Sequence, residues 1–90
     1  MAKFAAGQMV ITPAALDALT RRDIDVALQR HLGGDWGEVC DADRQENELA
    51  LTQGFRLFSV YRASDGTNRK FWIITEANRS VTTILLPEDY

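Results

Sequence analysis

The sequence contains one cysteine and one histidine in 90 residues. Cys40 has no partner for an intramolecular disulfide, which fits a reducing compartment. The acidic neighbours Glu38 and Asp41 disfavour the thiolate form that a nucleophilic cysteine requires. His31 lies on the apolar stripe of an expected helix, a position typical of a packed or helix-capping histidine. We therefore predict no catalytic residue and expect a protein that is not an enzyme.

Positive charge and long apolar runs are also scarce. The chain has 10 Lys and Arg against 13 Asp and Glu, a net charge of −3, which has the wrong sign for general nucleic-acid binding. No run approaches the ~18 apolar residues of a membrane span, and the first residues lack the apolar core of a secretory signal. We expect a cytoplasmic protein without a membrane partner, with nucleic acid as a less favoured partner than protein.

The composition is that of an ordinary globular protein. Hydrophobic residues make up 46% of the chain and charged residues 26%, so disorder is not indicated. Ninety residues leave no room for a second core. The sequence therefore predicts a single domain over residues 1–90.

The organising stretch is Phe55–Leu86, in which three runs rich in β-branched and aromatic residues are separated by two turn signals. This pattern predicts a three-stranded antiparallel meander. Asp65-Gly66 suits a two-residue hairpin turn, which would pair Val60 with Phe71 and Phe58 with Ile73. A second turn at Ala77–Ser80 would follow.

The length of the first turn decides which side chains share a face of the sheet. A two-residue turn gives an almost wholly apolar core face and a mixed opposite face, but it also sets Arg62 against Arg69. A loop of four or five residues would relieve that repulsion, and the five-residue loop would exchange the partners across the first hairpin, so these alternatives stay open. In the first register the core face carries Phe58, Val60, Phe71, Ile73, Ile84 and Leu86.

Helix signals occupy the first half of the chain. Gln8–Thr12 is a short apolar run that suits an edge strand, and Thr12-Pro13 then opens a short helix. Thr20 begins a second, amphipathic helix that Gly33-Gly34 ends. Asp41 or Asp43 caps a third helix, which ends at Gly54. The predicted class is α+β: about three N-terminal helices, with an optional short strand before them, packed on a C-terminal three-stranded antiparallel meander.

Five residues are candidate binding residues. Aromatic rings on a sheet face beside basic residues can stack nucleic-acid bases, but apolar neighbours on the same face favour a protein interface, with a second copy or another protein. In the Thr75–Ser80 turn an acid and an arginine lie close enough to bind a polar ligand or to form a local ion pair. The candidates are Trp36, Tyr61, Trp72, Glu76 and Arg79.

The segment Asp35–Glu48 is rich in carboxylates, with Arg44 as its one basic residue. Such a cluster could hold a hard cation or a basic partner, but the glycine and glutamate of a calcium-binding loop do not line up. Carboxylates at the start of a helix are favourable without any ligand. We predict no metal and no cofactor.

Three stretches resemble a known group of proteins: GDWGE at Gly34–Glu38, ENELAL at Glu46–Leu51, and WIITEANRSVTTILLPEDY at Trp72–Tyr90. The chain is similar to uncharacterised small proteins of bacterial plasmids and integrative elements, often labelled "plasmid-related". Those sequences commonly have Asp where Asn78 stands here. The resemblance implies a mobile-element setting, such as conjugation, defence, counter-defence or plasmid maintenance.

The leading functional hypothesis is a non-enzymatic module that binds protein through the mixed sheet face. One alternative is an RNA-directed, toxin-like nuclease that would use Tyr61 and Arg56, Arg62 and Arg79. Another is a counter-defence inhibitor that covers the basic surface of a nuclease with the acids of Asp35–Glu48. The sequence favours the first hypothesis because it lacks a catalytic set.

Overall fold

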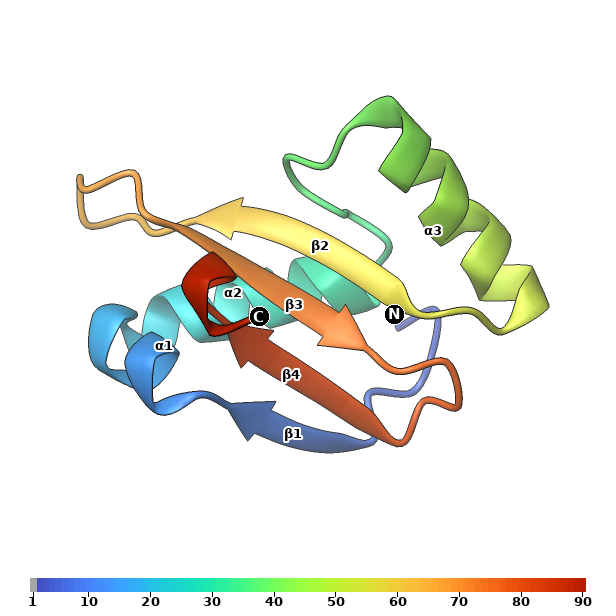
Figure 1. Ribbon diagram of the computed structural model, residues 1–90, viewed down its shortest axis with the longest axis horizontal. Coiled ribbons are helices and arrows are strands. Elements are labelled where there is room, and N and C mark those ends of the chain that lie inside the picture. Colours follow the sequence, from blue (N-terminus) through green and yellow to red (C-terminus); the bar gives the residue numbers. More distant parts are fainter. Residues whose placement is uncertain (1) are drawn as a thin grey trace.

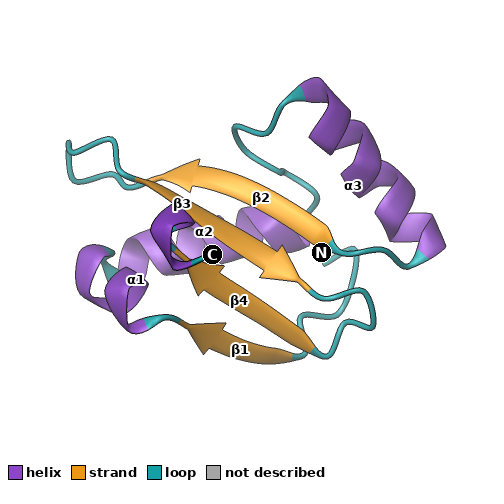
Figure 2. Cartoon of the chain, viewed as in Figure 1, coloured by secondary structure: helices purple, strands orange, loops and turns teal. Residues whose placement is uncertain are grey.

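The computed structural model describes residues 2–90 and has an α+β fold (Figures 1 and 2). None of its described helices is long and apolar enough to cross a membrane. One strand followed by three helices fills the first half of the described chain, and strands dominate the second half. The elements are β1 (Gln8–Ile11), α1 (Pro13–Ala18), α2 (Arg21–Leu32), α3 (Asp41–Gln53), β2 (Leu57–Arg62), β3 (Lys70–Thr75), β4 (Val81–Leu85) and the 3₁₀ turn η1 (Pro87–Asp89).

The sheet is mixed and has four strands in the order β1-β4-β3-β2 (Figure 1). β2, β3 and β4 form the expected antiparallel meander, but β1 extends it by pairing parallel to β4. The meander is confirmed, and the optional strand expected at Gln8–Thr12 is present at the sheet edge, but its parallel pairing makes the whole sheet mixed and not purely antiparallel. Parallel pairing between the two ends of a chain needs no tight turn, so no local sequence signal marks it.

Side-chain caps set the helix boundaries. Thr12 and Thr20 accept the predicted hydrogen bonds from the backbone N–H groups of Ala15 and Asp23. Gly54 ends α3 in the left-handed conformation, with φ of 77°, as predicted. The start of α3 differs, because Cys40 and neither Asp41 nor Asp43 is its N-cap: the Cys40 Sγ accepts from the Asp43 N–H at 3.5 Å.

The first hairpin has a five-residue loop, the longest of the predicted alternatives. The N–H of Ala63 donates to the carbonyl of Arg69 at 2.8 Å, which leaves residues 64–68 as a five-residue loop. Within this loop the Asp65 carboxylate accepts from the Thr67 N–H at 3.0 Å and the Thr67 hydroxyl at 2.6 Å. This local turn competes with the two-residue hairpin that Asp65-Gly66 suggested. Val60 consequently pairs with Trp72 and not with Phe71.

In this register, Phe58 and Val60 of β2 lie on the opposite face from the one predicted for a two-residue turn. In Figure 1, α2 passes behind the sheet and η1 lies in front of it. The face toward α1 and α2 holds the larger apolar core, and we call the other face the open face. The buried core members on the helix side are Ala15, Leu19, Ala27, Tyr61, Ala63, Phe71, Ile73, Ile84 and Leu86.

The outer edge of β2 is closed by two devices. The Asn47 side chain of α3 donates to the carbonyl of Phe58 at 2.6 Å and accepts from its N–H at 3.0 Å. Farther along, the loop at residues 36–38 pairs with both backbone groups of Val60, at 2.8 and 3.1 Å. Gly37 makes that approach possible, because its φ is 73° and a Cβ there would lie 2.0 Å from the Val60 oxygen.

Asn47→Ala is expected to lower the free energy of unfolding by about 2–3 kcal/mol, since it leaves the N–H and the carbonyl of Phe58 without partners in a half-buried site. Urea denaturation at neutral pH measures this. Gln45→Ala, at an exposed position on the same helix, is the matched control. Equal stability of the two variants would show that Asn47 does not hold this edge.

Candidate functional site

A row of buried polar side chains runs beneath α2. His31 is fully buried, and its Nδ1 lies 2.6 Å from the Ser59 hydroxyl of β2. Its Nε2 lies 2.9 Å from the Thr75 hydroxyl of β3, which lies 2.7 Å from the Thr82 hydroxyl of β4. The Thr82 hydroxyl donates to the carbonyl of Ala6 at 2.7 Å. This polar row joins the helix, three strands and the segment before β1.

The direction of the last hydrogen bond determines all the others. Because the Thr82 hydroxyl donates to Ala6, it accepts from Thr75, and the Thr75 hydroxyl in turn accepts from the Nε2–H of His31. The remaining nitrogen, Nδ1, then accepts from the Ser59 hydroxyl. His31 is thus a neutral imidazole with the proton on Nε2. Burial lowers its pKa from 6.5 to about 4.

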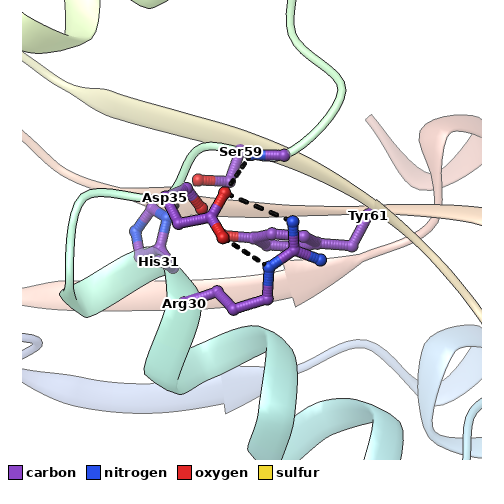
Figure 3. A network of polar contacts seen from close by, with 6 residues as sticks. Arg30, His31, Asp35, Ser59 and Tyr61 are labelled. Carbon is purple, nitrogen blue, oxygen red and sulfur yellow. Dashed lines mark hydrogen bonds and ion pairs between the residues drawn. The ribbon is translucent and has the colours of Figure 1, made fainter.

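A second polar group lies beside this row, at the C-terminal end of α2 (Figure 3). The Arg30 guanidinium donates to both carboxylate oxygens of Asp35, at 2.8 and 3.2 Å, and lies 4.8 Å from the centre of the Tyr61 ring. The Tyr61 hydroxyl donates to the Asp35 carbonyl at 2.6 Å, and burial raises its pKa to about 12. These contacts join α2, the following loop and β2, so they stabilise the fold.

Trp36 and Tyr61, two of the predicted binding residues, are buried on the helix side. Trp36 is 3% exposed, stacks on Phe4 and donates its indole N–H to Glu48 at 2.8 Å. Tyr61 is 2% exposed and belongs to the core. Their rings therefore face the interior of the described chain and not a shared surface with Trp72.

The β3–β4 turn places Glu76 and Arg79 at the end of the sheet next to the C-terminus of α3. Arg79 does not pair with the Glu76 side chain; its guanidinium donates to backbone carbonyls. One nitrogen bonds Phe55 at 2.6 Å and Ala50 accepts from the other at 2.9 Å, with weaker bonds to the turn itself. Arg79 therefore links α3, the start of β2 and the β3–β4 turn.

Trp72 lies on the open face, beside a cavity. The cavity has a volume of about 320 Å³ and lies between α3 and the C-terminal residue. Trp72 meets Phe58 edge to face at 5.1 Å and Tyr90 at 5.7 Å between ring centres. We call it the open-face groove; it is lined by Asp43, Glu46, Asn47, Arg56, Phe58, Trp72, Ile74 and Tyr90.

The walls of the open-face groove carry opposite charge. Asp43 and Glu46 of α3 form no ion pair within residues 2–90. Across the groove, the Arg56 side chain donates to the Tyr90 hydroxyl at 2.9 Å and lies 5.7 Å from the centre of its ring. One wall therefore presents free carboxylates, while the cation on the other is engaged by tyrosine.

Sequence reasoning missed Phe58 and Tyr90 as members of this site. Phe58 was assigned to the core because a two-residue turn points it away from Trp72. The five-residue alternative puts both rings on one face, and the Arg62–Arg69 repulsion was the signal in its favour. Tyr90 follows Pro87, whose turn brings the chain back over the sheet.

Comparison with known proteins yields no relative: no protein family, curated protein or solved structure matches the chain. Across residues 2–90, no group of three or more His, Cys, Asp or Glu side chains could hold a metal ion.

His31 makes stability depend on pH mostly above the range in which ordinary carboxylates titrate. The unfolded state binds a proton below pH 6.5 and the folded state only below about 4, so stability falls as the pH is lowered through that window. The two pKa values correspond to a loss of about 2 kcal/mol between pH 7 and pH 5. Urea denaturation of the wild type and of His31→Gln measures it, with the dependence expected to be absent from the variant.

Because the chain has one histidine, its NMR titration is unambiguous. The imidazole is expected to stay neutral to below pH 5 in the folded protein, in the Nε2–H form. A titration midpoint near 6.5 would contradict the buried polar row.

Arg79→Lys is expected to cost about 1–2 kcal/mol of stability, because a lysine cannot reach carbonyls of three segments with one fork of donors. Thermal and urea unfolding measure this. Arg22→Lys, at an exposed position of α2, should leave stability unchanged. If the two substitutions have equal effects, Arg79 is free for another role.

Proposed function

We propose that this protein is a protein-interaction module whose open-face groove binds a basic segment of a partner protein. The segment would carry a Lys or Arg next to an apolar side chain. The observation that carries the proposal is an aromatic floor, Phe58 and Trp72, in a groove between α3 and Tyr90. This floor lies beside two carboxylates that form no ion pair within residues 2–90.

The chemistry of the groove matches such a segment. A cation placed over an indole ring is attracted by the ring's electron density, most strongly by tryptophan. Asp43 and Glu46 supply the opposite charge at the wall, and Ile74 adds apolar surface at the floor. Tryptophan and tyrosine also dominate binding energy at protein interfaces. A side chain with an apolar stem and a charged end fits both parts of this site.

The residues that a nuclease would need are dispersed. Tyr61 is buried on the helix side, with its hydroxyl donating to a backbone carbonyl. Arg79 is engaged by carbonyls at one end of β2, and Arg62 pairs with Glu38 at the other end, at 2.8 Å. This geometry supports a binding module over an RNA-directed enzyme.

The counter-defence hypothesis shares part of this chemistry. Most acids of the segment are already engaged by arginines or by the Trp36 indole, which leaves Asp43 and Glu46 as its free carboxylates. A basic nuclease surface would thus meet the same groove. That the partner is a nuclease, and that the protein belongs to a mobile element, both stay predictions.

The test begins with a displayed library of short random peptides selected against the immobilised protein. We expect selected sequences to combine Lys or Arg with a neighbouring apolar residue. Synthetic peptides should change Trp72 fluorescence, and their affinity should fall as salt rises, since the charges lie near the surface. Trp72→Ala should weaken binding by roughly 10-fold or more, and Glu46→Gln should reduce its salt dependence.

Leu49→Ala, at an exposed position on α3 outside the groove, is the control and should bind like the wild type. Peptides that bind Trp72→Ala as tightly as the wild type would contradict the proposal. A selection that enriches no basic sequence would also contradict it.

A further inference from the structure

The second edge of the sheet, formed by β1, is open. The N–H groups of Gln8 and Thr12 donate to carbonyls on the β4 side, at 2.8 and 3.0 Å. Backbone groups alternate in direction along a strand, so Val10 also faces β4 while Met9 and Ile11 face away from it. Outside the β1–β4 ladder, no described residue bonds the N–H or C=O groups of Met9 and Ile11, and no described segment lies beyond β1 in Figure 1.

This open edge contrasts with the treatment of β2. On β2, a buried asparagine and a loop occupy both backbone groups of Phe58 and Val60. Proteins usually cover, charge or interrupt a strand edge, since a row of free N–H and C=O groups pairs with other chains. The sequence of β1, QMVI, contains neither a charge nor a proline. It has the properties of an edge that receives another strand.

An apolar groove lies beside the open edge, on the helix side of the sheet. It has a volume of about 280 Å³ and is bordered by α1 and α2. Its apolar lining is partly exposed: Met9 is 41% and Leu16 59% accessible. We call it the β1 groove; its lining includes Met9, Ile11, Leu16, Ile24 and Leu28.

We propose that a second copy of this chain occupies this surface, with the two β1 strands paired antiparallel across a two-fold axis near Val10. In that register Met9 of one copy faces Ile11 of the other, and the pair exchanges both N–H···O=C bonds. The symmetry repeats the exchange on the other side of the axis. The two sheets become one continuous sheet, and Met9 and Ile11 of each copy lie toward the β1 grooves.

The surface is self-complementary, which favours a second copy over a foreign peptide. The occupant must be extended, short and apolar on the groove side, and β1 itself meets these requirements. The rim is charge-balanced: Arg21 and Asp25, both exposed, lie 3.8 Å apart. Two copies therefore meet without like-charge repulsion although the whole chain has a net charge of −3.

The experiment is sedimentation equilibrium from micromolar to near-millimolar protein. The wild type is expected to reach twice the mass of one chain. Met9→Pro removes an N–H that points away from β4 and so leaves the β1–β4 pairing intact. It should raise the dimer dissociation constant by roughly 30-fold, because each dimer loses two donors. Leu16→Lys places a charge in the β1 groove and should give the same result.

Val26→Lys is the control, since Val26 is 49% exposed on α2 outside the β1 groove and its substitution should leave the dimer intact. Circular dichroism checks folding. If Met9→Pro is unfolded, Leu16→Lys decides the test alone, because Leu16 is exposed in the single chain. A wild type that stays monomeric, or a dimer that survives both groove variants, would overturn the proposal.

Loss of the dimer in Trp72→Ala but not in Met9→Pro would also overturn it, because it would place the contact on the open face. The two proposals fail separately. Met9→Pro should still bind the peptides selected for the open-face groove, and Trp72→Ala should still dimerise.

Discussion

The fold depends on a buried chain of hydrogen bonds that runs from α2 across the sheet. His31, Ser59, Thr75 and Thr82 are all fully excluded from solvent, and each satisfies its neighbour. Polar groups in such a place are costly unless every one is paired. If one strand shifted by one residue, a hydroxyl would leave the row and a ring nitrogen of His31 would lose its hydrogen-bond partner. The row thus requires one register, one helix position and one tautomer at the same time.

The two faces of the sheet differ in how they are covered. The helix side is filled by α1 and α2, by the polar row and by the Arg30–Asp35 pair with Tyr61, so its aromatic and basic residues stabilise the fold. The open face keeps its aromatic floor accessible because α3 lies at the edge of β2 and not across the strands (Figure 1). The peptide-binding site that we propose accordingly lies on the open face, around Trp72.

Local signals were enough to predict much of the fold. Thr12, Thr20 and Gly54 mark their helix ends by side-chain or backbone chemistry that acts within a few residues. The turn expected at Ala77–Ser80 joins β3 and β4, with Ile73 opposite Ile84.

Features that depend on distant residues were not predictable from the sequence. The first hairpin has two turns of similar merit, and the choice between them depends on what Ser59 and Tyr61 meet in the folded protein. The parallel pairing of β1 and the double hydrogen bond of Asn47 join segments far apart in the sequence. The site was missed in part for the same reason: Phe58 joins Trp72 only in the longer-loop register.

The different treatment of the two sheet edges also sets a limit on assembly. Backbone pairing consumes one edge from each participant, so a sheet with two accessible edges can add chains at both ends without limit and grow into a fibre. Here Asn47 and the loop at residues 36–38 block one described edge. A chain of this kind can pair with another strand at one sheet edge, the β1 edge. Any assembly built that way is finite and closes at two copies.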